Sequence, residues 1–260
     1  MNEVKPVLLE NAKDLAYAAG KILREQLYSD FTIEYKGEID LVTDADKAAE
    51  ALLTKAITTA YPQHALLTEE GGKLGNPDSQ YLWVIDPLDG TTNFAHRLPY
   101  FSVSIALLEN GRPIIGVVYN PIADEMFAAE QGYGAWLNDE PIKVSQTPTL
   151  KQSLLCTGFP YDMSVPNNNL DKYANLVKET QGVLRLGSAA LDLCYVACGR
   201  LDGFWEMHLK PWDMAAGALI AQEAGATVTG ISKEELDLTA GEIAATNGLI
   251  HQALMEQIKS

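Results

Sequence analysis

Residues 83–96 read WVIDPLDGTTNFAH, and this stretch decides how the rest of the chain is interpreted. Apolar and aromatic residues fill positions 81–85, which is the pattern of a short buried strand. Two carboxylates, Asp86 and Asp89, follow at the expected exit of that strand, and Pro87 between them suits a turn. The sequence therefore predicts a buried strand that delivers two acids to one turn.

Gly90, Thr91 and Thr92 follow the second acid and predict a short helical turn. Glycine permits a close backbone approach, and the first amide N–H groups of a helical turn can face an anion. A phosphate held there is repelled by Asp86 and Asp89, and a divalent cation between these groups removes the conflict. We therefore expect a phosphate site bridged by metal ions.

The spacing of the acids supports this expectation. Asp86 and Asp89 lie three positions apart across a turn, so their oxygens can reach one ion, or two ions about 4 Å apart. The carbonyl of Leu88 adds a neutral oxygen, and Mg²⁺ prefers such hard ligands. An isolated D-x-x-D-G string also has a simpler interpretation, a polar turn in which Asp89 is an ordinary cap.

Four motifs together resemble the signatures of the inositol monophosphatase family. Residues 83–96 resemble its first signature, and WDMAAGALIAQEAGA, residues 212–226, resembles its second. DLVTDAD at 40–46 and LLTEEGG at 66–72 match its two remaining acidic motifs, in order. The resemblance spans essentially the whole chain, and four ordered motifs are not expected by chance.

The resemblance implies a layered αβαβα sandwich of the sugar-phosphatase type, in the α+β or α/β class. Periodicity predicts helices at 4–28 and 43–60, a loop at 73–80, and then an antiparallel meander with a hairpin at Asn110-Gly111. After residue 150, strands and helices alternate, which indicates a mixed α/β half. We expect one domain, 1–260, whose halves, about 1–150 and 151–260, pack as one unit.

Composition limits the function classes. The chain has 260 residues, 47% of them hydrophobic, with 19 Lys+Arg against 35 Asp+Glu and a formal charge of −16. Such a balance argues against a nucleic-acid groove, which needs a basic patch, but permits an anionic substrate if metal ions supply positive charge. The N-terminus lacks the pattern of a signal peptide, no apolar run approaches a membrane span, and the three cysteines suggest free thiols. We therefore expect a cytoplasmic location and no membrane contact.

The resemblance implies two to three Mg²⁺ ions in each site. The ligands that it implies are Glu69, Asp86, the carbonyl of Leu88, Asp89 and Asp213. Simpler interpretations stay open for two of them, because Asp213 can be the N-cap of the helix that follows it and Glu69 can be a solvated loop acid.

The resemblance also implies that water is the nucleophile. Thr91 orients this water, with Asp46 and Glu69 behind it, and attack is in line without a phospho-enzyme. Asp46 also completes a capping box that begins at Thr43, so it has a structural interpretation as well. Haloacid-dehalogenase-type phosphatases use an aspartate nucleophile in D-x-D-x-T, which the D-x-x-D spacing here does not match.

The expected phosphate and substrate contacts come from several segments. Backbone N–H groups at Gly90 and Thr91 cradle the phosphate, and the resemblance adds Asp89, Ala189, Glu206 and Asp213. Glu206 ends an expected strand, where acids are often only exposed. Lys36 is either a solvated lysine or a residue near the metal site.

These residues predict Mg²⁺-dependent hydrolysis of a phosphate monoester. By resemblance the substrate is inositol monophosphate, and the enzyme is a lithium-sensitive homodimer. Fructose-1,6-bisphosphate, NADP(H), histidinol phosphate and 3′-phosphoadenosine phosphates stay open as substrates. A non-catalytic, protein-binding role in transcription complexes is the alternative from another class.

Overall fold

The computed structural model describes residues 4–29, 32–35 and 41–259. Two helices lead into a first sheet, and strands and helices alternate afterwards. The elements in chain order are α1 (Val4–Gln26), β1 (Ile33–Tyr35), β2 (Leu41–Thr43), α2 (Asp44–Ala60), β3 (Ala65–Thr68), β4 (Gly72–Gly75), β5 (Tyr81–Asp89), α3 (Thr91–Ala95), β6 (Ser102–Glu109), β7 (Arg112–Asn120), β8 (Glu125–Glu130), β9 (Gly134–Leu137), β10 (Glu140–Pro141), η1 (Leu150–Gln152), β11 (Leu154–Thr157), α4 (Leu170–Glu179), β12 (Gly182–Leu184), α5 (Ala189–Ala197), β13 (Gly203–Met207), α6 (Pro211–Glu223), β14 (Thr227–Thr229), β15 (Glu242–Thr246) and α7 (His251–Ile258).

In the described ranges the strands form two large sheets and the small β1–β2 pair. The first sheet has eight strands in the order β10-β9-β8-β7-β6-β5-β3-β4, antiparallel except where β3 pairs with β5. The second has five strands in the order β12-β11-β13-β15-β14, of which β12, β11 and β13 run parallel. The first half of the chain is thus a meander and the second a mixed sheet, as the sequence predicts.

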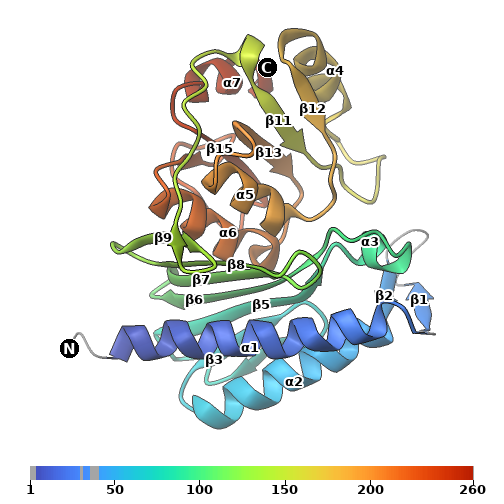
Figure 1. Ribbon diagram of the computed structural model, residues 1–260, viewed down its shortest axis with the longest axis vertical. Coiled ribbons are helices and arrows are strands. Elements are labelled where there is room, and N and C mark those ends of the chain that lie inside the picture. Colours follow the sequence, from blue (N-terminus) through green and yellow to red (C-terminus); the bar gives the residue numbers. More distant parts are fainter. Residues whose placement is uncertain (1–3, 30–31, 36–40, 260) are drawn as a thin grey trace.

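Buried apolar side chains place these sheets between helices (Figure 1). Helices α1 and α2 cover one face of the first sheet, and α5 and α6 cover the other. Successive residues of β5 show the alternation, because Trp83 packs toward α1 and α2 whereas Val84 packs toward α5 and α6. The second sheet meets α5 and α6 on one face and α4 and α7 on the other. This arrangement is the expected αβαβα sandwich.

Helix α6 lies in the middle layer and contacts both sheets. Residues 214–221 of this helix are all buried, and most are small or apolar. A Cβ added at Gly116 of β7 would lie 2.7 Å from the carbonyl oxygen of Ala216, so strand and helix touch backbone to backbone. A Cβ at Gly217 would lie 2.8 Å from Cβ of Leu193 on α5. Small residues therefore fix α6 against its neighbours, and with it the position of its first turn.

Most expected elements are found, and two expectations are wrong. The helices at 4–28 and 43–60 correspond to α1 and α2, and the Asn110-Gly111 turn joins β6 to β7. The loop expected at 73–80 instead begins as β4, which pairs with β3 from Gly72 to Gly75 through backbone bonds that polar side chains do not oppose. Strand β5 also does not end before Asp86 but continues to Asp89. The number of domains stays a prediction, and no described helix is both long and apolar enough to span a bilayer.

Candidate active site

The end of β5 brings Asp86 and Asp89 onto an irregular stretch of strand. Asp86 pairs with Ser104 and Asp89 with Ser102, so the register with β6 shifts between the two acids. Pro87 lies in this shift, where a residue without an N–H is tolerated. The N–H of Leu88 donates to Asp86 Oδ1 at 2.9 Å, which fixes that carboxylate locally. An irregular last stretch of β5, with a shifted register, therefore presents the two acids.

Gly90 and Thr91 form the turn after the bulge. Gly90 has φ of 100°, and a Cβ there would lie 3.1 Å from both Cβ of Phe101 and the Tyr100 carbonyl oxygen, so this position requires glycine. Thr91 begins α3, the short helical turn that the sequence predicts. Its hydroxyl donates to the Leu88 carbonyl at 3.0 Å and lies 3.3 Å from Asp46 Oδ1.

Asp46 reaches the site from the first turn of α2. Its Oδ2 accepts from the N–H and the hydroxyl of Thr43, at 2.8 and 2.5 Å, and the capping box predicted from the sequence is present. Its other oxygen faces Thr91. Asp46 therefore completes the capping box, as its structural interpretation predicts. It also makes the contact with Thr91 that a catalytic role requires. The catalytic role stays a prediction.

Asp213 enters the site from the first turn of α6. The expectation that it is the N-cap is wrong, because Lys210 is the N-cap and Pro211 occupies the first helical turn. The Lys210 N–H donates to Asp213 Oδ2 at 2.7 Å, so the carboxylate caps from the third helical position. Ser104 Oγ donates to the Trp212 carbonyl at 3.1 Å, and Ser104 pairs with Asp86. This link joins the start of α6 to the end of β5.

The N-terminus of α5 holds the second acid of the bulge. Ser188 Oγ and the Ala190 N–H donate to Asp89 Oδ2 at 2.6 and 2.8 Å. The neighbouring Ala189 N–H also lowers the pKa of Asp89. Ala189, which the sequence analysis expects to contact substrate, therefore lies at the site with its N–H turned toward Asp89.

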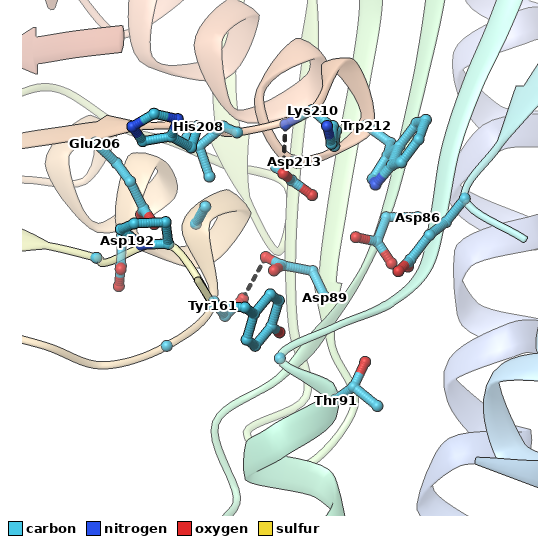
Figure 2. A pocket seen from close by; sticks show the side chains of 18 of the residues that line it. Asp86, Asp89, Thr91, Tyr161, Asp192, Glu206, His208, Lys210, Trp212 and Asp213 are labelled. Carbon is cyan, nitrogen blue, oxygen red and sulfur yellow. Dashed lines mark hydrogen bonds between the residues drawn. The ribbon is translucent and has the colours of Figure 1, made fainter. Parts of the chain in front are cut away.

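A cavity of about 390 Å³ opens between these elements. Every residue predicted for metal or substrate binding lines it, namely Glu69, Asp86, Leu88, Asp89, Gly90, Thr91, Ala189, Glu206 and Asp213. Figure 2 shows the carboxylates of Asp86, Asp89 and Asp213 turned toward a shared space, with Thr91 below them. Glu69 follows the end of β3, which runs parallel to β5 and so delivers its acid to the same edge of the sheet.

Burial and mutual repulsion make this acid cluster costly. Burial, together with the charges of Glu69, Asp89 and Asp213, raises the pKa of Asp86 well above its usual value. Burial and the charge of Asp89 raise the pKa of Asp213 likewise. Burial raises the pKa of Asp89 to about 6, although its Ser188 and Ala190 donors oppose the change. Positive charge placed among these carboxylates would lower the pKa of all three.

The donor set fits a hard divalent cation. The side chains facing the cavity from β3, β5 and α6 offer carboxylate oxygens, and the Leu88 carbonyl adds a neutral one. Within the described ranges, no three His, Cys, Asp or Glu side chains already stand in an arrangement that holds a metal ion. The fit to Mg²⁺ therefore rests on ligand chemistry and shared burial.

Several further residues of this cavity are not among those predicted from the sequence. Asp192 of α5 lines it, accepts a hydrogen bond from the Tyr100 hydroxyl at 2.7 Å, and is 1% exposed. Burial raises the pKa of Asp192 to about 7, and Glu206 lies beside it in Figure 2. Arg185, His208 and Lys210 also line the cavity. An acid inside an otherwise apolar helix was the available signal for Asp192. Lys36 lies outside the described residues.

Comparisons with known proteins agree with this geometry. The sequence model of the inositol monophosphatase family matches residues 5–260. The chain belongs to the inositol monophosphatase family. The resemblance drawn from the four motifs is thereby confirmed.

Relatives of known name align along nearly the whole chain. The chain is 50% identical over 252 residues to the inositol-1-monophosphatase of Synechocystis sp., and this alignment covers 96% of the chain and 88% of the relative. It is 41% identical over 255 residues to Nus factor SuhB of Escherichia coli strain K12, with 97% and 96% covered. The solved inositol monophosphatase of Anabaena (Nostoc) sp. superposes with a TM-score of 0.89 at 48% identity, covering 97% of this chain and 95% of that one.

Family membership sets the class of reaction. As a member of the inositol monophosphatase family, the chain is a phosphatase, a phosphoric monoester hydrolase that acts on small phosphorylated substrates. The family depends on metal ions, generally Mg²⁺. The solved relatives also confirm the layered sandwich.

Proposed function

We propose that the chain hydrolyses inositol monophosphate to inositol and phosphate with Mg²⁺. One observation carries the proposal: Asp86, Asp89 and Asp213 face one cavity beside the Gly90 turn, and the charge of Asp89 adds to burial in raising the pKa of the other two. An acid cluster next to an anion-binding turn is unfavourable unless cations lie between it and a phosphate. The substrate follows from the names of the relatives, among them the Synechocystis inositol-1-monophosphatase.

Two to three Mg²⁺ ions would be held by the predicted ligands. Asp86, Asp89 and Asp213 form one set, and Glu69, Asp86 and the Leu88 carbonyl form another, with a third, weaker ion near Glu69. When bound, the ions offset the charge of the carboxylates and the phosphate and favour attack by water. No histidine is needed as a base in this arrangement.

The roles of the other residues follow from their contacts. Thr91, held between the Leu88 carbonyl and Asp46, orients the attacking water, and Glu69 assists. The backbone N–H groups of Gly90 and Thr91 cradle the phosphate for in-line displacement, without a phospho-enzyme. Ala189, Glu206, Asp89 and Asp213, which line the same cavity, surround the leaving group.

A phosphate-release panel tests the proposal. The purified protein with Mg²⁺ is assayed on inositol monophosphate, fructose-1,6-bisphosphate, NADP(H), histidinol phosphate and 3′-phosphoadenosine phosphate. We expect the highest kcat/KM on inositol monophosphate, inhibition by lithium, and loss of activity in Asp89→Asn. The matched control is Asp78→Asn, which changes an exposed acid in the loop after β4. Preference for another substrate refutes the substrate assignment, and unchanged hydrolysis by Asp89→Asn refutes the site.

A second candidate function is binding to protein partners of transcription. The observation that favours it is the 41% identity to a protein named Nus factor SuhB. Asp89→Asn separates the two functions, because it should abolish hydrolysis and leave binding intact. We further propose a homodimer in the cytoplasm. The charge of −16 favours the absence of direct nucleic-acid contact. Sedimentation of the purified protein tests the dimer.

A further inference from the structure

Gly158 directly follows β11 and lies beside Glu206. Strands β11 and β13 run parallel, and their last pair joins Thr157 to Trp205. One step further along both strands brings Gly158 next to Glu206, and both line the cavity. The sheet register therefore sets a glycine against the acid that faces the leaving group in the proposed reaction.

The carboxylate of Glu206 occupies the space that a side chain at position 158 would fill. A Cβ added at Gly158 would lie 2.1 Å from Oε1 of Glu206 and 2.3 Å from both Cδ and Oε2. Gly158 does not have the positive φ seen at Gly90, so its backbone is one that other residues adopt. A larger residue at position 158 would therefore meet the Glu206 carboxylate, and would not strain the backbone.

The backbone at Gly158 is fixed by a buried network. Asn169 Nδ2 donates to the Gly158 carbonyl and to Thr157 Oγ1, each at 2.7 Å. Trp205 Nε1 donates to Asn169 Oδ1 at 2.7 Å, and Thr157 Oγ1 donates to the Trp205 carbonyl at 2.5 Å. A larger residue at 158 therefore cannot move this wall. The far end of Glu206, with its rotatable bonds, has to move instead.

We propose that Gly158 is a specificity-determining positioning residue of this phosphatase. By presenting no side chain, it lets the Glu206 carboxylate lie against the cavity wall, where its oxygens can accept hydrogen bonds from hydroxyl groups of a polyol leaving group. Glu206 is 9% exposed, and burial raises the pKa of its carboxyl well above the usual value, so its position against the wall, rather than a free charge, decides which hydroxyl groups it meets. The inference rests on the proposed function, because it assumes that a polyhydroxylated leaving group lies in this part of the cavity.

The test compares two substrates in a double-mutant cycle. Gly158→Ala, Glu206→Ala and the double variant are assayed on inositol monophosphate and on p-nitrophenyl phosphate, whose leaving group has no aliphatic hydroxyl. We expect Gly158→Ala to raise KM for inositol monophosphate about tenfold, with little change in kcat, since a hydrogen bond to the buried Glu206 carboxyl group is lost. For Gly158→Ala, kcat/KM on p-nitrophenyl phosphate should fall much less than kcat/KM on inositol monophosphate. In the Glu206→Ala background, Gly158→Ala should cause no further rise in KM for inositol monophosphate.

Gly182→Ala on β12 is the matched control, because its Cβ would meet one side-chain atom, of Leu154, at 3.3 Å. If Gly158→Ala unfolds the protein, the melting temperatures of Glu206→Ala and of the double variant still test the proposal. Glu206→Ala removes the atoms that the new Cβ meets, so the double variant should regain the melting temperature of Glu206→Ala.

Three results overturn the Gly158 proposal: an unchanged KM for inositol monophosphate in Gly158→Ala, an equal loss on both substrates, or a double variant that stays unfolded. The proposed function fails separately, if the wild-type protein hydrolyses p-nitrophenyl phosphate and leaves inositol monophosphate intact.

Discussion

Replacing Asp192 by asparagine should stabilise the folded protein at alkaline pH. Asp192 is buried on α5, and its Oδ1 accepts from the Tyr100 hydroxyl at 2.7 Å. An asparagine oxygen can accept the same bond without carrying a charge. The substitution therefore removes the cost of a buried negative charge and keeps the hydrogen bond that orders the residue.

The size and sign of this change in stability follow from the pKa of Asp192. Burial raises the pKa of Asp192 from 3.8 to about 7, and the charge of Asp89 acts in the same direction. Between these values the folded state holds a proton that the unfolded chain has released, so stability is lost as pH rises toward 7. The pKa difference corresponds to a stability loss on the order of 4 kcal/mol above pH 7. Asp192→Asn does not titrate and should recover most of it.

Thermal unfolding of the metal-free protein at pH 4.5 and pH 8.5 measures the effect. We expect similar melting temperatures for wild type and Asp192→Asn at the lower pH, and an advantage of roughly 10 °C for the variant at the higher pH. Asp78→Asn, an exposed substitution that keeps Asp192, is the control and should show no advantage over wild type at either pH. An advantage of equal size at both pH values, or none at pH 8.5, would refute the argument that ionisation of Asp192 opposes folding.

Three further predictions concern the site and its scaffold. Thr91→Ala should lower kcat about a hundredfold or more in a folded protein, because the hydroxyl between Leu88 and Asp46 is lost, whereas Thr91→Ser should keep much of the activity in the same phosphate-release assay. Removal of divalent ions with a chelator should lower the melting temperature. Mg²⁺ at a hundred times the Kd of the wild-type protein should restore about 2.7 kcal/mol of stability in wild type, and the same concentration should restore less in Asp89→Asn. Calorimetry that shows equal gains in both proteins would contradict the assignment of Asp89 as a ligand. Thr43→Ala should cost about 1–2 kcal/mol in urea unfolding, since Thr43 is buried and caps α2 through Asp46, and Thr43→Ser should recover most of that loss.

Local signals were enough to predict the elements that carry the site. The apolar run before Asp86, the Asn110-Gly111 hairpin and the Thr43 capping box each depend on neighbouring residues, and each is found. Polar residues and glycine predict a loop at 73–80, which is correct for 76–80 and wrong for 73–75. Its first residues form an edge strand through backbone bonds with β3, to which side-chain polarity is largely indifferent.

Other parts of the site depend on contacts between distant residues. Asp192 and Tyr100 meet across 92 positions, and nothing near Asp192 in an apolar helix indicates that partner. The link from Ser104 to Trp212, which joins α6 to β6, spans 108 positions. Motif resemblance identified Asp213 without showing how it reaches the site. The contact between Gly158 and Glu206 likewise needs the register of two parallel strands, which their sequences do not determine.

Helix α6 is buried against both large sheets, and its first turn carries Asp213. A ribosome delivers β15 (Glu242–Thr246), a central strand of the second sheet, only after α6 has emerged. Until then the second sheet, which packs on this helix, is incomplete, and the position of the first turn of α6 beside the aspartates of β5 is not fully fixed. A nascent chain should therefore be unable to cleave phosphate esters until translation has passed residue 246, and activity should appear abruptly, as a late event of synthesis.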